Sequence, residues 1–201
     1  MLRVVTSGKA NRMAYKIALF MHICGVLGLF AGIGIELVGA IGFRGARTVD
    51  QVRTNARVVK VTVALFPAAT VVVISAGVYM ALTQWSFRTP FVVVGLITLL
   101  VIVALGATIQ GKQWQMVEKA ADGLPNGPVP ESLGRLINDP VAWSSMAGGV
   151  FGALAVVFLM TIKPGWAAAI AIAVVAYAVG GLAGWLFAKP RAEAAVVRVA
   201  D

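Results

Sequence analysis

The feature that most constrains this chain is a set of five long apolar segments separated by polar stretches. They cover about residues 17–42, 60–83, 91–110, 142–162 and 166–188. An α-helix needs roughly 20 apolar residues to cross a bilayer, and each segment reaches that length. In lipid every backbone polar group must be paired within the chain, and a helix achieves this pairing. The sequence therefore predicts an all-α, polytopic membrane helix bundle with about five transmembrane helices, forming a single domain over residues 1–201.

Composition supports lipid as the solvent for much of this surface. Of the 201 residues, 60% are hydrophobic and 12% are charged, whereas a soluble domain has about a quarter charged residues. The first apolar segment is longer than the roughly 7–15 residues of a signal-peptide core, which favours a retained helix. Each tryptophan lies near a proposed helix end, as an aromatic belt at the headgroup level predicts. These residues are Trp85, Trp114, Trp143, Trp166 and Trp185.

Local signals define several boundaries. Thr48 followed by Gln51 has the form of a capping box, so the second helix is expected to run over about 49–83. Asp139-Pro140 is typical of an N-cap followed by proline at the first helical position. Residues 163–165, Lys-Pro-Gly, predict a tight turn that makes the last two helices an antiparallel hairpin. The glycine pairs 148/152 and 180/184 have the small-residue spacing of close helix packing.

One substantial polar loop is expected over about residues 111–139, with turn chemistry at 124–128 and a short surface helix over 131–137. Of the 17 lysines and arginines, six lie on the side of the N-terminus. The positive-inside rule therefore predicts that this loop and the C-terminus are cytoplasmic, in a bacterial inner (plasma) membrane.

The net charge of +9 is not arranged as in a nucleic-acid-binding protein, because the basic residues lie between apolar runs without interleaved aromatics. Such residues are expected to contact anionic lipid headgroups. Arg53, Arg57 and Lys60 share one side of the second helix and are candidates for this contact.

The first helix carries the only constellation with possible chemistry. At 100° per residue, its histidine, its intramembrane carboxylate and several glycines fall on one stripe of roughly 120°. Glycines on such a stripe let another backbone, or a flat cofactor, approach closely. The members are Met21, His22, Gly25, Gly28, Gly32, Glu36 and Gly39.

His22 has two interpretations. It could be an axial ligand of haem iron, with Gly25, Gly28 and Gly32 making room for the macrocycle. It could also be a neutral histidine that bonds a carbonyl or hydroxyl of a neighbouring helix. Under the predicted orientation it lies about a turn and a half inside the extracytoplasmic boundary. Cys24 lies about 200° around the helix from His22, so the two cannot hold one metal ion together.

Glu36 lies near 21 Å from His22 along an ideal helix, too far to share a site. It could form part of a proton relay, or it could form an ion pair with Lys60 or Arg57 at the end of the second helix. The sequence contains no phosphate-binding glycine loop and no Ser/His/Asp set, so neither nucleotide binding nor hydrolysis has support.

Two stretches suggest a family resemblance. Residues 15–25 (YKIALFMHICG) look like the opening of small bacterial membrane proteins whose first helix carries a leucine/histidine/glycine signature. Residues 158–165 (FLMTIKPG) are similar to a hairpin turn in an uncharacterised family of predicted integral membrane proteins. That family is distantly similar to CopD-like copper-resistance proteins and HemJ-like membrane proteins.

The likeness to HemJ-like proteins implies that His22 would hold b-type haem. The second ligand would be Met21, Met80, Met160 or the His22 of another protomer in a homo-oligomer. CopD-like proteins use several histidines, whereas this chain has one, so copper export is not implied.

Three functions follow as hypotheses: a structural or accessory membrane component, a haem-binding redox protein using His22, or a small transporter or channel with Glu36 lining a path. No enzymatic activity is assigned.

Overall fold

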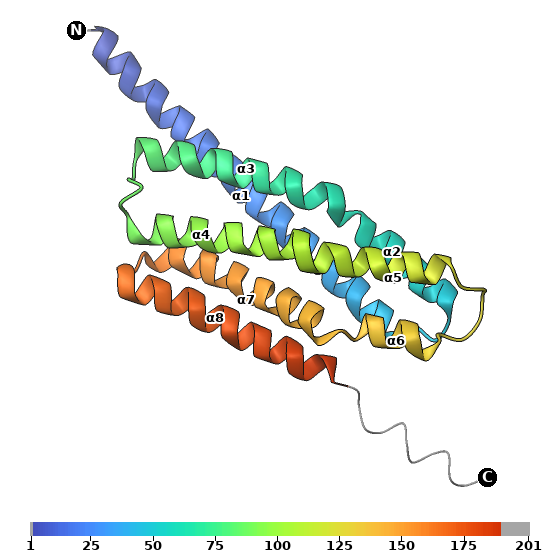
Figure 1. Cartoon of the computed structure of the whole chain (residues 1–201). Helices are drawn as coiled ribbons and strands as arrows, with labels where there is room; N and C mark the ends of the chain where they lie inside the picture. Colours follow the sequence, from blue (N-terminus) through green and yellow to red (C-terminus); the bar gives the residue numbers. More distant parts are fainter. Residues whose placement is uncertain (1, 190–201) are drawn as a thin grey trace, which may run out of the picture.

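A computed structural model describes the backbone of residues 2–189 and the side chains of residues 11–189 (Figure 1). Five segments are long and apolar enough to cross a membrane: Asn11–Gly45, Val49–Thr83, Pro90–Asp122, Glu131–Ile162 and Trp166–Ala188. The predicted all-α bundle of five spans is confirmed, and the protein is a multi-pass membrane protein. Its orientation stays a prediction, and the basic C-terminal tail on which that prediction partly depends lies outside the described residues.

The first two spans form a pair. Helix α1 (Leu2–Gly45) packs along α3 (Thr62–Thr83), and α2 (Val49–Lys60) leads into α3 through Val61. The predicted capping box opens α2, since Thr48 accepts a hydrogen bond from the Gln51 backbone and the Gln51 side chain accepts one from the Thr48 backbone. Helix α3 alone is about 33 Å long, enough to cross a hydrocarbon layer of about 30 Å. The polar α2 therefore extends beyond that layer.

The third span differs from the expected helix followed by a loop. Helix α4 (Pro90–Leu105) continues through the π-helical turn η1 (Gly106–Gln110) into α5 (Gly111–Asp122). Residues 111–122 are thus helical rather than loop, because Trp114, Val117 and Ala121 form an apolar stripe that is buried. The expected short helix is present as α6 (Glu131–Ile137).

The last two spans form the predicted hairpin. Helices α7 (Pro140–Ile162) and α8 (Trp166–Ala188) pack closely against each other. The Asp139 carboxylate caps α7 by accepting a hydrogen bond from the Ala142 backbone N–H at 2.8 Å. Lys163 ends α7 in the left-handed conformation, with φ of 56°.

Glycines set the separation of α7 and α8. A Cβ on Gly180 would lie 2.6 Å from the Ala147 carbonyl oxygen, and one on Gly184 would lie 2.2 Å from the Trp143 carbonyl oxygen. Only glycine permits two backbones to approach this closely, so the packing predicted from the glycine spacing is confirmed.

The largest buried cluster lies at one end of the bundle. We call the helices that meet there, the C-terminal part of α1 with α2, α5 and α6, the helical cap. The cluster also includes residues at the adjoining ends of α7 and α8. It contains Ala40, Phe43, Val49, Val52, Ala56, Val59, Trp114, Val117, Ala121, Leu133, Ile137, Trp143, Met146 and Ala188.

The cap changes the interpretation of two tryptophans. Trp85, Trp166 and Trp185 are exposed near helix ends, as an aromatic belt requires. Trp114 and Trp143 are buried instead, at 7% and 2% exposure. Their indole N–H groups bond to protein acceptors, so both are core residues rather than headgroup anchors.

Candidate functional site

A cavity of about 1190 Å³ lies between the α1–α3 pair and helices α4 and α7. Its walls are mostly aliphatic and aromatic, with contributions such as Val26, Phe30, Phe66, Leu99 and Val156. Ligand pockets for small molecules span about 300–1,000 Å³, so this cavity has room for a large apolar molecule. Three of its lining residues have polar or ionisable side chains that matter for a possible binding site: His22, Glu36 and Gln110.

His22 is held by the neighbouring helix. Its Nδ1 lies 3.0 Å from the backbone carbonyl oxygen of Val73. A carbonyl can only accept a hydrogen bond, so Nδ1 carries the proton and donates it. Nε2 of this neutral imidazole then keeps its lone pair, and within the described residues it makes no hydrogen bond. His22, which lines the cavity, therefore keeps one ring nitrogen that is able to coordinate a metal.

The depth of His22 differs from the expectation. Val73 lies midway along α3, so His22 is beside the centre of that span rather than near its end. Helix α1 begins at Leu2 and extends past the end of α3 (Figure 1). His22 therefore lies deeper in the bundle than a helix beginning at about residue 17 would place it. Gly77, which sequence reasoning missed, makes room for the imidazole: a Cβ there would lie 3.3 Å from His22 Cε1.

The glycine stripe meets α3. A Cβ on Gly25 would lie 2.7 Å from Val73 Cγ2, and one on Gly32 would lie 2.8 Å from Phe66 Cε1. A Cβ on Gly28 would lie 3.2 Å from Ala69 Cβ. None of the three glycines lines the cavity. The stripe allowed two partners for these glycines, another helix or a flat cofactor, and the structure shows another helix. Of the stripe's residues, His22 and Glu36 are the ones that line the cavity.

Glu36 does not pair with Lys60. The Trp114 indole N–H donates to Glu36 Oε1 at 2.9 Å, and Lys60 Nζ lies 3.2 Å from Glu118 Oε1. The expected ion pair was wrong because residues 111–122 form a helix, which brings both Trp114 and Glu118 to α1 and α2. The proton-relay role of Glu36 stays a prediction.

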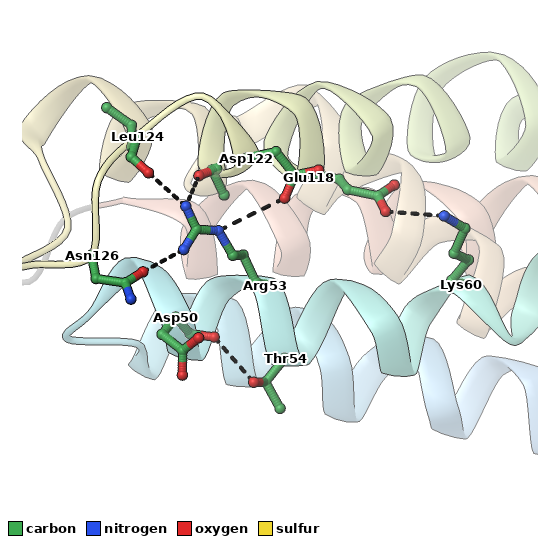
Figure 2. A network of polar contacts seen from close by, with 9 residues as sticks. Asp50, Arg53, Thr54, Lys60, Glu118, Asp122, Leu124 and Asn126 are labelled. Carbon is green, nitrogen blue, oxygen red and sulfur yellow. Dashed lines mark hydrogen bonds and ion pairs between the residues drawn. The ribbon is translucent and has the colours of Figure 1, made fainter.

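The basic side of α2 is turned partly inward. Figure 2 shows Arg53 reaching the C-terminal end of α5 and the segment that follows it, where it meets Asp122 at 3.7 Å and donates to the Leu124 carbonyl at 2.6 Å. Its guanidinium also donates to the Ala121 carbonyl at 2.9 Å. Arg53 and Lys60 therefore join α2 to α5, rather than being free for lipid headgroups. Arg57 is exposed.

A second polar group lies next to the cavity at the π-helical turn. The buried Gln110 side chain donates to Ser145 Oγ at 3.3 Å, joining η1 to α7. The Tyr177 hydroxyl oxygen is also buried within the bundle, near Ser145. Its ring fills the space left by Gly148 and Gly152. This cluster was not predicted, because it depends on the register of three helices.

Among the described residues no three or more His, Cys, Asp or Glu side chains gather as they would around a metal ion. Cys24 is exposed. A metal bound at this site would thus rely on His22, with methionine as the remaining soft ligand. Met80 and Met160 line the same cavity.

No protein-family model, curated protein or solved structure matches this chain. Five helices that are long and apolar enough to span a membrane make this a polytopic helical membrane protein.

Proposed function

We propose that this protein binds a flat, hydrophobic cofactor within the bilayer, namely b-type haem, with His22 Nε2 as the iron ligand. The observation that carries the proposal is the hydrogen bond from His22 Nδ1 to the Val73 carbonyl. Histidines that bind metals almost always donate their other ring N–H to such an acceptor, which fixes the tautomer and the orientation of the ring. The family resemblance of residues 15–25 favours the same ligand.

The residues around His22 fit such a group. The cavity is large and apolar, which suits a macrocycle. Met80 and Met160, which line the same cavity, are the residues that could supply a second ligand to the iron. Bound haem would supply one-electron redox chemistry. The chain's own contribution is to orient the imidazole from α3, to exclude water with aliphatic walls, and to hold the site midway between the two faces of the membrane.

The test is an absorption spectrum of the protein purified in mild detergent after expression with haem supplied. We expect a Soret band in the wild type that is lost in His22→Ala and in His22→Gln. A glutamine side chain can still donate a hydrogen bond to the Val73 carbonyl, so the second variant keeps the packing while removing the iron ligand. Cys24→Ser, two residues along the same helix, is the matched control and should keep the band.

A wild-type protein without a Soret band, or a band that persists in both His22 variants, would contradict the proposal. A structural or accessory role in the membrane would then be the remaining hypothesis for His22. Its hydrogen bond to Val73 would serve only to join α1 to α3.

A further inference from the structure

The Glu36 end of the cavity has features that the haem proposal does not use. The Glu36 side chain is only 7% exposed, yet it lines the cavity. Trp114 occupies one of its two oxygens, Oε1. Within the described part of the chain the other oxygen, Oε2, accepts no hydrogen bond. A nearly buried carboxylate therefore keeps one oxygen without a protein partner beside an apolar cavity.

No cationic side chain in the described residues compensates Glu36. Three lysines line the cavity: Lys60, Lys119 and Lys163. Lys60 pairs with Glu118 (Figure 2), and the exposed Lys119 makes no ion pair. Lys163 Nζ lies over the Trp85 ring, 4.5 Å from its centroid, at the opposite end of the bundle. A buried carboxylate without a counter-ion is unfavourable, so Glu36 either takes up a proton or pairs with a cation from outside the chain.

The walls of the cavity limit what kind of cation fits. Phe30 and Phe66 line the cavity on α1 and α3, and the Trp114 indole borders it from α5. The faces of aromatic rings attract cations, and the aliphatic walls accept apolar groups but exclude a strongly hydrated ion. A single positive charge carried on an apolar organic body matches both properties.

The cavity is also accessible from the lipid. Helices α3 and α4 both line it. Although they are consecutive in the chain, they pack against other helices and hardly contact each other. The cavity therefore opens between α3 and α4, where an apolar cation dissolved in the bilayer would enter without crossing a polar surface.

We propose that this end of the cavity is a binding site for a lipophilic organic cation, with Glu36 Oε2 as its counter-ion. The site goes beyond the proposed haem site, because Glu36 and His22 are separated by about 21 Å along α1. Neither site requires the other to be occupied, so a failure of one leaves the other standing.

The test is equilibrium dialysis of radiolabelled tetraphenylphosphonium against the full chain in dodecyl maltoside. We expect saturable binding by the wild type, and binding at least about tenfold weaker in Glu36→Gln, because a hydrogen-bonded or paired charge in a buried site is lost. The glutamine side chain in this variant would still accept the Trp114 hydrogen bond, so the local packing is kept. Asp50→Asn, which removes an exposed negative charge from α2, is the matched control and should bind as the wild type does.

Tetraphenylborate has the same shape as tetraphenylphosphonium and the opposite charge, so it separates charge recognition from apolar partitioning. Its binding should be no stronger in the wild type than in Glu36→Gln. The proposal is overturned if the wild type does not bind tetraphenylphosphonium saturably, or if Glu36→Gln binds it as tightly as the wild type. It is also overturned if Asp50→Asn loses binding to the same extent, since the effect would then reflect net charge alone.

Discussion

The contact between α7 and α8 allows a prediction in which two neighbouring glycines respond oppositely to the same substitution. In Gly184→Ala the new methyl group would lie 2.2 Å from the Trp143 carbonyl oxygen and 2.6 Å from the carbonyl carbon. Ordinary van der Waals contact begins about 1 Å farther out, at 3.4 Å. Both clashing atoms belong to the backbone, so no side chain can rotate away and the two helices must separate.

The magnitude follows from two opposing effects. Overpacking of a close-packed contact costs about 1–3 kcal/mol, whereas replacing glycine by alanine inside a helix contributes about 0.5–1 kcal/mol of stability. We therefore expect Gly184→Ala to lower the free energy of unfolding by about 1–2 kcal/mol. For a chain of this size such a loss corresponds to a fall in Tm of roughly 2–8 °C.

Gly181→Ala is the matched control on the same helix. Its methyl group would meet only the Ser144 carbonyl oxygen, at 3.8 Å, which is ordinary contact. The gain in helix propensity is then unopposed, so Tm should stay the same or rise. Thermal unfolding of both variants in one detergent, followed by circular dichroism, makes the comparison. A Gly184→Ala protein that melts at or above Gly181→Ala would refute the reasoning.

Two further predictions concern the helical cap. Trp114→Phe keeps an aromatic ring stacked near Phe43 but removes the N–H that Glu36 accepts, so we expect a loss of about 1–3 kcal/mol in unfolding free energy. In a Glu36→Leu background, which has no acceptor for the indole N–H, the same substitution should cost less, and an equal cost in both backgrounds, measured by thermal unfolding, would contradict the interaction. Arg53→Lys cannot hold the Ala121 and Leu124 carbonyls together, so limited proteolysis should cut residues 123–130 faster. Asp122→Asn, which removes only a long ion-pair contact to a largely exposed carboxylate, should change the cleavage rate much less.

The sequence by itself determined the features that depend on neighbouring residues. Hydropathy located the five spans because each helix satisfies its own backbone and presents its apolar side chains to lipid. Thr48 and Asp139 identified helix starts, since a capping interaction involves only residues within three positions along the chain. The glycine spacing in α7 and α8 predicted their close packing for the same reason: it is a pattern on one helix face.

The tertiary structure alone decided which groups meet across the bundle. The partner of Glu36 is Trp114 and the partner of Lys60 is Glu118, and neither pair could be predicted while α5 was expected to be a loop. The depth of His22 beside Val73 and the presence of the cavity likewise depend on the register between helices that are distant in sequence. That register is set by the summed packing of many side chains, because a shift of one helical turn moves every contact by about 5.4 Å while leaving each helix unchanged.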